Sequence, residues 1–357
     1  MLTRPKLKLL IPDAESNHTL NILHCLVPKT GIEVYALSSK PKAYFRHSRY
    51  CKKFIPRSEE MTETELVACI IDQLEEHAID MLFPIDEEGI QLVAKFSSTL
   101  TKHCELPLLP NHETAKMVCD KWQFFEQLKD ENIPVPDTEM AEQHQKIAYP
   151  KILKPRKGQN GNGVFLVEND TELSEKDFPI ESYLAQDYIN GYDIDCSFLA
   201  DNGKILACTV QKPIGIRSLW NRFKPSREIE LCHNEAVADV IHKVVGKLEW
   251  SGVGHADLRF SEKDGRYYLI EINPRYWSSI LASLAAGINF PLLALNHPAY
   301  SSPKQDFDEV YYLGIKSRIK QLLGKKLENQ RKEIPVFSSL SHMAKDPLPF
   351  LAFKFGF

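Results

Sequence analysis

Cysteine motifs, long apolar runs and blocks of like charge are all missing from this chain of 357 residues. Its eight cysteines are scattered, and no two are spaced as Cys-x-x-Cys, which argues against a zinc site. Scattered cysteines of this kind are typical of reduced thiols, so we predict a cytoplasmic protein. Each cysteine is then expected to be a small apolar core residue and not a nucleophile.

Charge and hydropathy exclude two further classes. The formal net charge is −4 and no segment concentrates one sign, so no nucleic-acid partner is expected. No stretch approaches the ~20 consecutive apolar residues of a membrane span. The apolar run Leu9–Ile11 is followed by Pro12 and Asp13, and we interpret it as a first strand, not as part of a signal peptide.

The first hundred residues alternate apolar strand-like runs with helical spacing. Strands are predicted over Lys6–Ile11, Ile32–Leu37 and Ile79–Ile85, with helices around Leu20–Val27 and Leu66–Leu74. This order predicts a parallel sheet that helices cover on both faces. The loop after the first strand holds no glycine, which argues against a dinucleotide site there.

Two charged clusters in this part allow two interpretations each. The acidic run Asp86–Gly89 follows the end of a strand, where it either faces a substrate or begins a helix. Arg46, Arg49 and Lys52 form either a solvated basic face or a contact for an acidic substrate.

A helix after the first hundred residues carries a lysine. Asn111 is placed to cap a helix whose apolar positions recur from Ala115 to Leu128. Lys121 lies within that helix. Two prolines, Pro134 and Pro136, then end it and lead the chain into a new unit.

The stretch from Gly254 to Trp277 has the pattern of a β-hairpin with a polar face. A turn is predicted at Lys263–Gly265. Side chains alternate along a strand with period two. The positions on one face are His255, Asp257 and Arg259 in the first strand and Tyr267, Leu269, Glu271 and Asn273 in the second.

The register of this hairpin decides whether two carboxylates meet. If Asp264 is at the centre of the turn, Asp257 lies opposite Glu271, which requires an odd loop or a glycine bulge. Two facing carboxylates repel each other unless a cation lies between them. With the amide oxygen of Asn273 they suit Mg²⁺, and Arg275 is placed to bind the phosphates that such an ion carries. A solvated polar hairpin is the alternative.

A second motif combines a lysine with glycines. The strand Lys151–Pro155 carries Lys154 and runs into Gly158–Val164, which holds three glycines. Backbone N–H groups of such a loop can approach phosphate oxygens. The spacing is not that of a P-loop. We therefore predict a flap over phosphates, with an ordinary hairpin loop as the alternative.

Further strands are predicted over Ser182–Tyr188, Tyr192–Leu199 and Gly203–Val210, the last of which leads to Lys212. The segment Ile214–Arg227 then looks like a long loop. Its basic residues are Arg217, Arg222, Lys224 and Arg227. Long loops in compact domains are often functional, so we interpret it as a clamp for an acidic substrate, or else as an exposed loop.

These features, in this order, resemble the ATP-grasp superfamily. The segment Tyr267–Pro291 is similar to part of carbamoyl-phosphate synthase large chains and of predicted ATP-grasp carboligases related to D-aspartate ligase. The resemblance covers roughly residues 110 to 297, and the front part fits the Rossmann-like domain that precedes ATP-grasp domains. It implies ATP as cofactor, with Mg²⁺ or alternatively Mn²⁺.

The resemblance also implies a role for each matching residue. Lys121 and Lys154 would hold phosphates of ATP, under a flap that contains Gly158, Gly161 and Gly163. The hinge Gln186, Asp187, Tyr188 and Ile189 would contact adenine, and Asp193 would bind ribose. The metal ligands would be Asp257, Glu271 and Asn273, and the catalytic residues Arg275 and, on weaker grounds, Lys212.

Two positions depart from the family pattern. Gln186 and Asp187 stand where many members have two glutamates, which changes the contacts on the adenine side. Arg259 stands where some relatives have a metal-binding glutamine, so a second metal would have fewer protein ligands.

The implied reaction is the ATP-dependent joining of a small-molecule carboxylate, or a peptide end, to an amine through an acyl phosphate. Chemistry of the bicarbonate or carbamoyl-phosphate type is an alternative, although the chain has room for a single ATP-grasp unit. A non-catalytic ATP-binding regulatory protein is a second alternative, which the intact set of lysines and metal ligands disfavours. A homodimer is compatible with all three.

We expect an α/β and α+β chain with four parts. These are a Rossmann-like domain over 1–110, the small ATP-grasp lobe with the flap over 111–185, the large lobe with the metal site over 186–300, and a C-terminal extension over 301–357. The extension ends in the apolar segment Asp346–Phe353, which we expect to pack on the body of the protein, on a partner subunit or on a membrane surface, in that order.

Overall fold

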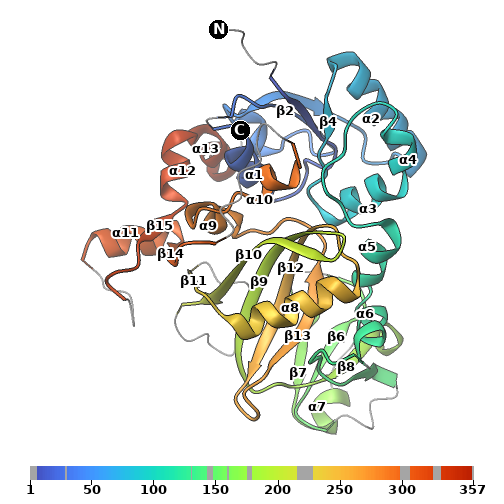
Figure 1. Cartoon of the computed structure of the whole chain (residues 1–357), viewed down its shortest axis with the longest axis vertical. Helices are drawn as coiled ribbons and strands as arrows, with labels where there is room; N and C mark the ends of the chain where they lie inside the picture. Colours follow the sequence, from blue (N-terminus) through green and yellow to red (C-terminus); the bar gives the residue numbers. More distant parts are fainter. Residues whose placement is uncertain are drawn as a thin grey trace.

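The computed structural model describes residues 6–28, 30–129, 131–142, 148–158, 161–174, 179–214, 228–297, 306–324 and 331–355. Within them the chain forms a parallel sheet, a small antiparallel sheet and a larger, mainly antiparallel sheet (Figure 1). The predicted combination of a parallel α/β part with antiparallel sheets is confirmed.

The first sheet is parallel and is covered by helices on both faces, as predicted. Its elements are β1 (Lys8–Ile11), α1 (Thr19–Leu26), β2 (Glu33–Ser38), η1 (Tyr44–His47), β3 (Cys51–Pro56), α2 (Glu63–His77), β4 (Met81–Leu82), α3 (Glu87–Lys95) and α4 (Ser97–Leu100), in the strand order β3-β2-β1-β4. Leu9 and Ile11 share a core with α1, whereas Leu10 packs with α2 on the opposite face. The strand predicted over Ile79–Ile85 is shorter, because only Met81 and Leu82 pair with β1.

Two helices stand where the sequence predicted one. They are α5 (His112–Val118) and α6 (Lys121–Leu128). Asn111 caps the first, since its side-chain oxygen accepts a hydrogen bond from the N–H of Thr114 at 2.8 Å. Asp120 caps the second in the same way, accepting from the N–H of Trp122 at 3.1 Å. Lys121 is therefore the first residue of a new helix.

The small sheet has the strand order β5-β8-β6-β7 and is antiparallel throughout. Its elements are β5 (Thr138–Met140), β6 (Lys151–Pro155), β7 (Phe165–Val167), α7 (Asp170–Ser174), η3 (Ile180–Ser182) and β8 (Tyr183–Asp187). The central strand β6 ends in Lys154 and Pro155 and leads into the glycine-rich segment.

The large sheet has the strand order β13-β12-β9-β10-β11-β14-β15. Its elements are β9 (Gly191–Asp201), β10 (Lys204–Pro213), β11 (Ile229–Leu231), α8 (Glu235–Lys247), β12 (Gly252–Ser261), β13 (Tyr267–Asn273), α9 (Ile280–Ala285), α10 (Phe290–Ala294), β14 (Val310–Leu313) and β15 (Val336–Ser338). The amphipathic helix α8 covers one face through Val237, Ile241 and Val244 (Figure 1). The polar side chains of the opposite face line a cavity.

The hairpin β12–β13 contains a bulge, one of the two alternatives that the meeting of the carboxylates required, but it lies at Ile270 and not at a glycine. The turn spans residues 262–265, because the N–H of Ser261 bonds to the carbonyl of Arg266, so it is not centred on Asp264. Leu258 pairs with Leu269 but Asp257 pairs with Glu271, which leaves Ile270 as the extra residue. The predicted meeting of Asp257 and Glu271 is confirmed. The predicted face of Leu269 is wrong, because Leu269 is buried in the core on the side of α8.

The C-terminal part packs against the first sheet. It contains α11 (Ile315–Leu322), α12 (Leu340–Lys345) and α13 (Pro347–Phe355). Asp346, between the last two helices, is 1% exposed and accepts hydrogen bonds from the hydroxyl of Ser48 and, at 3.1 Å, from the N–H of Arg49. The ring of Phe353 lies 5.3 Å from that of Tyr44. One side of the apolar end, with Pro349 and Ala352, thus packs on the body of the protein, the first of its expected positions, while Phe353 is 75% exposed.

Over the same described residues, none of the helices has both the length and the apolar character needed to cross a membrane.

Candidate active site

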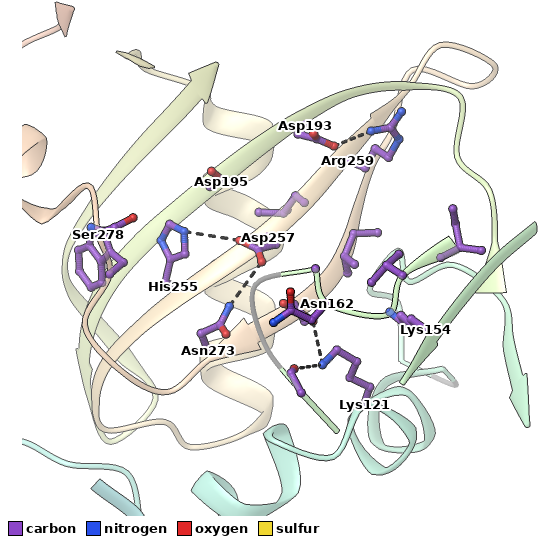
Figure 2. A pocket seen from close by; sticks show the side chains of 18 of the residues that line it. Lys121, Lys154, Asn162, Asp193, Asp195, His255, Asp257, Arg259, Asn273 and Ser278 are labelled. Carbon is purple, nitrogen blue, oxygen red and sulfur yellow. Dashed lines mark hydrogen bonds and ion pairs between the residues drawn. The ribbon is translucent and has the colours of Figure 1, made fainter. Parts of the chain in front are cut away.

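A cavity of about 500 Å³ lies between the small sheet and the polar face of the large sheet (Figure 2). The structure brings most of the predicted site residues into its lining. These are Lys121, Lys154, Gly158, Gly161, Gln186, Asp187, Tyr188, Ile189, Asp193, Asp257, Glu271, Asn273 and Arg275. In Figure 2 the lysines lie on one side of the cavity, and Asp257, His255 and Asn273 lie on the other.

Lys154 is held in place by the small sheet. Its side chain is almost completely buried, and its Nζ donates to Oε1 of Gln186 at 2.9 Å. Gln186 is oriented in turn, because its Nε2 donates to the hydroxyl of Thr138 at 2.8 Å. Burial lowers the pKa of Lys154 to about 8, against the opposing charge of Glu271.

Lys121 links the glycine-rich segment to the large sheet. Its Nζ donates to the carbonyl of Gly158 at 2.7 Å and lies 3.3 Å from Oε2 of Glu271. Its own N–H donates to the carbonyl of Arg156, whose Nε donates to Asp120 at 2.7 Å. The start of α6 and the start of the glycine-rich segment are therefore joined, with both lysines close to one carboxylate.

Polar side chains form two rows across the adjacent strands of the large sheet. The first row is Glu271, Asp257, Asp195 and Gln211, on β13, β12, β9 and β10, and the second is Asn273, His255 and Ser197 on β13, β12 and β9. Neighbouring strands are about 4.8 Å apart. Three carboxylates consequently stand side by side, with oxygen and nitrogen donors in the next row.

The carboxylates of the first row have opposite pKa shifts. Withdrawal from solvent, followed by the charges of Asp195 and Glu271, raises the pKa of Asp257 well above its ordinary value. Withdrawal from solvent acts in the same direction on Glu271, but the two cavity lysines outweigh it, so the pKa of Glu271 is lowered. A cation would relieve this repulsion, and the carboxylates of Asp257 and Glu271 are oxygen ligands that fit Mg²⁺. The amide of Asn273 lies beside them, with its Nδ2 3.4 Å from Oδ2 of Asp257 and its oxygen 3.4 Å from Nη2 of Arg275.

A second group of possible ligands shares Asp257. Its ligand atom and those of Asp195 and His255 all lie within 4.8 Å of one another. The Nδ1 of His255 is 2.9 Å from the hydroxyl of Ser197, and the imidazole stacks on Trp277 at 5.6 Å. Burial, as the main cause, lowers the pKa of His255 to about 3, so the ring is neutral at physiological pH.

Arg259 forms hydrogen bonds with the segment between β8 and β9 and with the start of β9. Its Nη1 pairs with Asp193, its Nε donates to the carbonyl of Ile189, and its Nη2 donates to the carbonyl of Gly191 at 2.8 Å. The guanidinium carbon also lies 5.6 Å from the centre of the Tyr188 ring. The role of Arg259, which its sequence position left open, is thus to hold the hinge segment at the cavity.

Arg275 lies where the cavity meets the first sheet. It is 7% exposed, and its Nη1 is 3.2 Å from Nε2 of His18 and donates to the carbonyl of Tyr276. Its Nε is 3.7 Å from Asp86. Asp86 also caps α3 by accepting from the N–H of Glu87, which confirms the helix-start interpretation of the acidic run. The first sheet therefore helps to place a predicted catalytic side chain.

Two predicted residues are absent from the described lining. Lys212 follows Gln211 along β10 and so takes the opposite face, where its Nζ is 3.3 Å from Glu230. The structure therefore does not bring Lys212 to the site. Gly163 has a φ of +73°, and an added Cβ would lie 2.6 Å from the hydroxyl of Tyr183, so this glycine is required by the fold of the segment.

Sequence analysis assigned no role to several residues that line the cavity. They are Asn17, His18, Asp195, Gln211, His255, Ser278 and Ser279. Asp195 was detectable, since it shares a strand face with Asp193. His18 follows the first strand of a parallel sheet, at the edge where such sheets bind ligands, which was a weaker signal.

Neither of the other basic groups is found in the part of the lining that the structure describes. The basic residues from Arg217 to Arg227 lie outside the described residues, so their interpretation as a clamp stays a prediction. Arg46, Arg49 and Lys52 are not part of the described lining, and Lys52 pairs with Glu33 at 3.3 Å.

Comparisons with known proteins agree with this geometry. Residues 118–279 match the family model of the ATP-grasp domain. A carbamoyl-phosphate synthase of Methanobrevibacter smithii is 25% identical over 228 residues, which are 59% of this chain and 61% of that protein. The chain therefore spans less than two thirds of that relative.

Solved structures share the fold at low sequence identity. An L-amino acid ligase from Bacillus licheniformis has a TM-score of 0.63 and 20% identity, covering 83% of this chain and 75% of its own. An N5-carboxyaminoimidazole synthetase from Staphylococcus aureus has a TM-score of 0.66 and 15% identity, covering 94% and 92%. Residues 118–279 therefore match an ATP-grasp domain, and the chain shares its fold with these ligase and synthetase structures.

Proposed function

We propose that this chain is an ATP-dependent ligase that activates a carboxylate as an acyl phosphate and joins it to an amine. One observation carries the proposal: Lys121 and Lys154 face Glu271 and Asp257 across a single cavity, with Arg275 at its end. Cations on one side and oxygen donors on the other suit a metal-bound triphosphate. Each charge-assisted contact contributes only ~1.5–3 kcal/mol, so the set must act together.

ATP would lie along the cavity from the hinge to the carboxylate row. The backbone of residues 186–189 would contact adenine and Asp193 would bind ribose. Lys154 and Lys121 would hold the phosphates, with the Gly158–Gly163 segment over them. The S. aureus synthetase was solved with ADP, which supports a nucleotide in the equivalent fold.

Asp257, Glu271 and Asn273 would hold Mg²⁺, which offsets phosphate charge when bound. An oxygen of the substrate carboxylate would attack the γ-phosphorus, and ADP would leave. The amine would then attack the acyl carbon and release phosphate and a proton. Arg275 and the two lysines would stabilise the charge that develops on the transferring phosphoryl group.

A bicarbonate or carbamoyl-phosphate reaction is the second candidate, because the curated relative is a carbamoyl-phosphate synthase. It uses the same nucleotide site and differs in the acid that is activated. ATP hydrolysis stimulated by bicarbonate in the absence of any organic acid would favour it. Nucleotide binding without turnover under every condition would instead favour a regulatory ATP-binding protein.

The test is an ATP and Mg²⁺ assay over a panel of organic acids and amines, read by ADP and phosphate release. Hydroxylamine should trap the acyl phosphate as a hydroxamate. Release of AMP, or ADP formation that no organic acid stimulates, would contradict the ligase proposal.

A further inference from the structure

The C-terminal part of the chain combines exposed apolar side chains with an excess of positive charge. We propose that the outward faces of α11 and α13, here called the C-terminal surface, bind the surface of an anionic membrane. Neither helix contributes a residue to the described lining of the cavity. The inference therefore goes beyond the proposed function and does not rest on it.

Exposed apolar side chains gather in this part of the chain. Eight of the eleven large apolar side chains that are exposed among the described residues lie after Gly314. They are Ile319, Leu322, Leu323, Phe337, Leu348, Leu351, Phe353 and Phe355. Figure 1 shows α11, α12 and α13, the orange to red helices, along one side of the molecule. Single exposed apolar residues are ordinary, whereas a concentration of them marks a surface that binds a partner or a membrane.

Helix α11 is amphipathic, and its polar side faces the protein. The positions that share its apolar side, at 3.6 residues per turn, are Ile315, Ile319, Leu322 and Leu323. On the opposite side, the hydroxyl of Ser317 donates to Glu228 at 2.6 Å. All eight residues of α11 are described and none of them is buried, and Leu322 and Leu323 are 64% and 83% exposed. Because a helix of a globular protein normally turns its apolar side to the core, this orientation leaves that side for another molecule.

Helix α13 is apolar on every side but is covered on only part of its circumference. Pro349 and Ala352 are buried against the body of the protein. Leu348, Leu351 and Phe355 recur with the spacing i, i+3, i+7 and are exposed. The only charged residue of this helix is Lys354, which is also exposed. A helix that is apolar all round is ordinarily enclosed by a protein core or by lipid.

The segment from Val310 to Phe357 differs from the rest of the chain in charge. It holds nine basic and three acidic residues, a net charge of +6, whereas residues 1–309 carry −10. These basic residues are interspersed with apolar ones, so they form no block in the sequence. The exposed lysines of the three helices are Lys316, Lys320, Lys345 and Lys354. On α11, Lys316 and Lys320 border the apolar side.

An anionic membrane fits both properties of this surface. A helix with leucines on one side and lysines beside them lies in the membrane interface, where the leucines enter the acyl layer and the lysines contact lipid phosphates. A second copy of this chain would bring together two surfaces that are each positively charged, and these would repel. A nucleic acid would pair with the lysines but leave the leucines in water.

The experiment measures how the full chain sediments with lipid vesicles. One set of vesicles is phosphatidylcholine alone, and the other is phosphatidylcholine mixed with phosphatidylglycerol. Affinity for the anionic vesicles should be at least about 10-fold higher, because each lysine near the surface contributes about a 5-fold factor. Raising the salt to ~1 M should remove most of this difference.

Two double variants of α11 test the two parts of the interaction. Leu322→Gln with Leu323→Gln should weaken binding to anionic vesicles about 10- to 100-fold, because the apolar contact with the acyl layer is lost. Lys316→Gln with Lys320→Gln should weaken it by about 5-fold for each lysine. Leu206→Gln is the matched control, since Leu206 is an exposed leucine on β10, and it should bind as the wild type does. All these variants should keep the wild-type melting temperature, because none of the changed side chains is buried.

Leu351→Gln with Phe355→Gln applies the same test to α13 and should also weaken binding to anionic vesicles. The absence of binding to either kind of vesicle would overturn the inference. Equal affinity for both kinds, or an equal loss in Leu206→Gln, would overturn it as well. A dimer in sedimentation velocity that Leu322→Gln with Leu323→Gln abolishes would instead assign the surface to a second copy of the chain.

Discussion

Asp346 is buried within the fold and Asp257 lines the cavity, and the surroundings of these two carboxylates differ in kind. Asp346 accepts hydrogen bonds from Ser48 and Arg49, residues nearly three hundred positions earlier in the chain. Asp257 faces Glu271 on one side and Asp195 on the other, and 37% of its side chain is exposed to the cavity. The first carboxylate is satisfied by the protein, whereas the second is repelled by it.

This difference separates a structural carboxylate from a functional one. A satisfied buried charge holds two parts of a chain together, and its loss leaves donors unpaired. A row of like charges weakens the free protein and is retained where a ligand completes it. Variants of each cluster should therefore differ in whether they change stability or activity.

The largest effect is expected for Glu271→Gln, which removes one charge from the carboxylate row. Turnover should fall about 10²- to 10³-fold, as for loss of a group that stabilises transition-state charge. ATP affinity should fall much less, because both lysines remain. Steady-state kinetics together with calorimetric ATP titration measure the two quantities. Normal turnover of this variant would show that Glu271 is not part of the active site.

Asp346→Ala tests the structural side of the comparison. The Ser48 hydroxyl and the Arg49 N–H lose their acceptor, so the free energy of unfolding should fall by about 2–4 kcal/mol. Chemical denaturation measures this change, and Ser48→Ala, which removes one bond, should lose about 1 kcal/mol. The kcat/KM for ATP, measured well below the melting temperature, should stay within about twofold of the wild-type value. An unchanged free energy of unfolding would show that Asp346 does not stabilise the packing of the C-terminal helices.

Lys154→Ala should weaken ATP binding about 10- to 100-fold, the equivalent of one lost charge-assisted contact. The wild-type profile should also depend on pH. The pKa of Lys154 is lowered to about 8 by burial, so the lysine is charged below that pH and loses its proton above it. The kcat/KM for ATP, which reports the free enzyme, should therefore decline as the pH rises through about 8.

Lys154→Arg provides the control for this pH dependence. Arginine keeps its charge, so the decline near pH 8 should disappear even if the new side chain binds phosphate less well. A decline that persists in the arginine variant would belong to another group.

The smallest expected effect is a gain in the free energy of unfolding and not a loss. Asp257→Asn should stabilise the nucleotide-free protein, because the raised pKa of Asp257 means that its charged form is disfavoured in the folded state. The gain should be below about 1 kcal/mol, since solvent in the cavity screens the repulsion. It should vanish below about pH 3, where the carboxyl group is protonated in the unfolded chain as well. A loss of stability at neutral pH would break the contrast with Asp346.

The hairpin β12–β13 shows which features of the site could be predicted from the sequence. Alternation within β12 and β13 indicated that Asp257 and Glu271 meet, and it did so because the signal is local. The bulge at Ile270 was not encoded in any turn residue, so the face of Leu269 was predicted wrongly. The chain order of the lysines, the glycine-rich segment and the hairpin was sufficient to predict the ATP-grasp domain that residues 118–279 match.

Long-range pairing explains what sequence analysis missed. Asp195 joins the row because β9 pairs with β12, more than fifty residues later, and that register is set by packing of the whole sheet. Lys212 was implied by the resemblance alone, and its place on the opposite face of β10 from Gln211 follows from the strand pairing. His18 reaches Arg275 from a different sheet, which no local pattern predicts.

The bulge at Ile270 also governs which changes of length this hairpin tolerates. It absorbs one surplus residue, so loss of a residue there would restore simple alternation and leave Glu271 and Asn273 on the cavity side. Loss of a residue between Glu271 and Asn273 would instead turn Asn273 toward the core. Among homologues, insertions and deletions in this hairpin should accordingly collect at the position of Ile270 and be absent two residues further on, at Ile272.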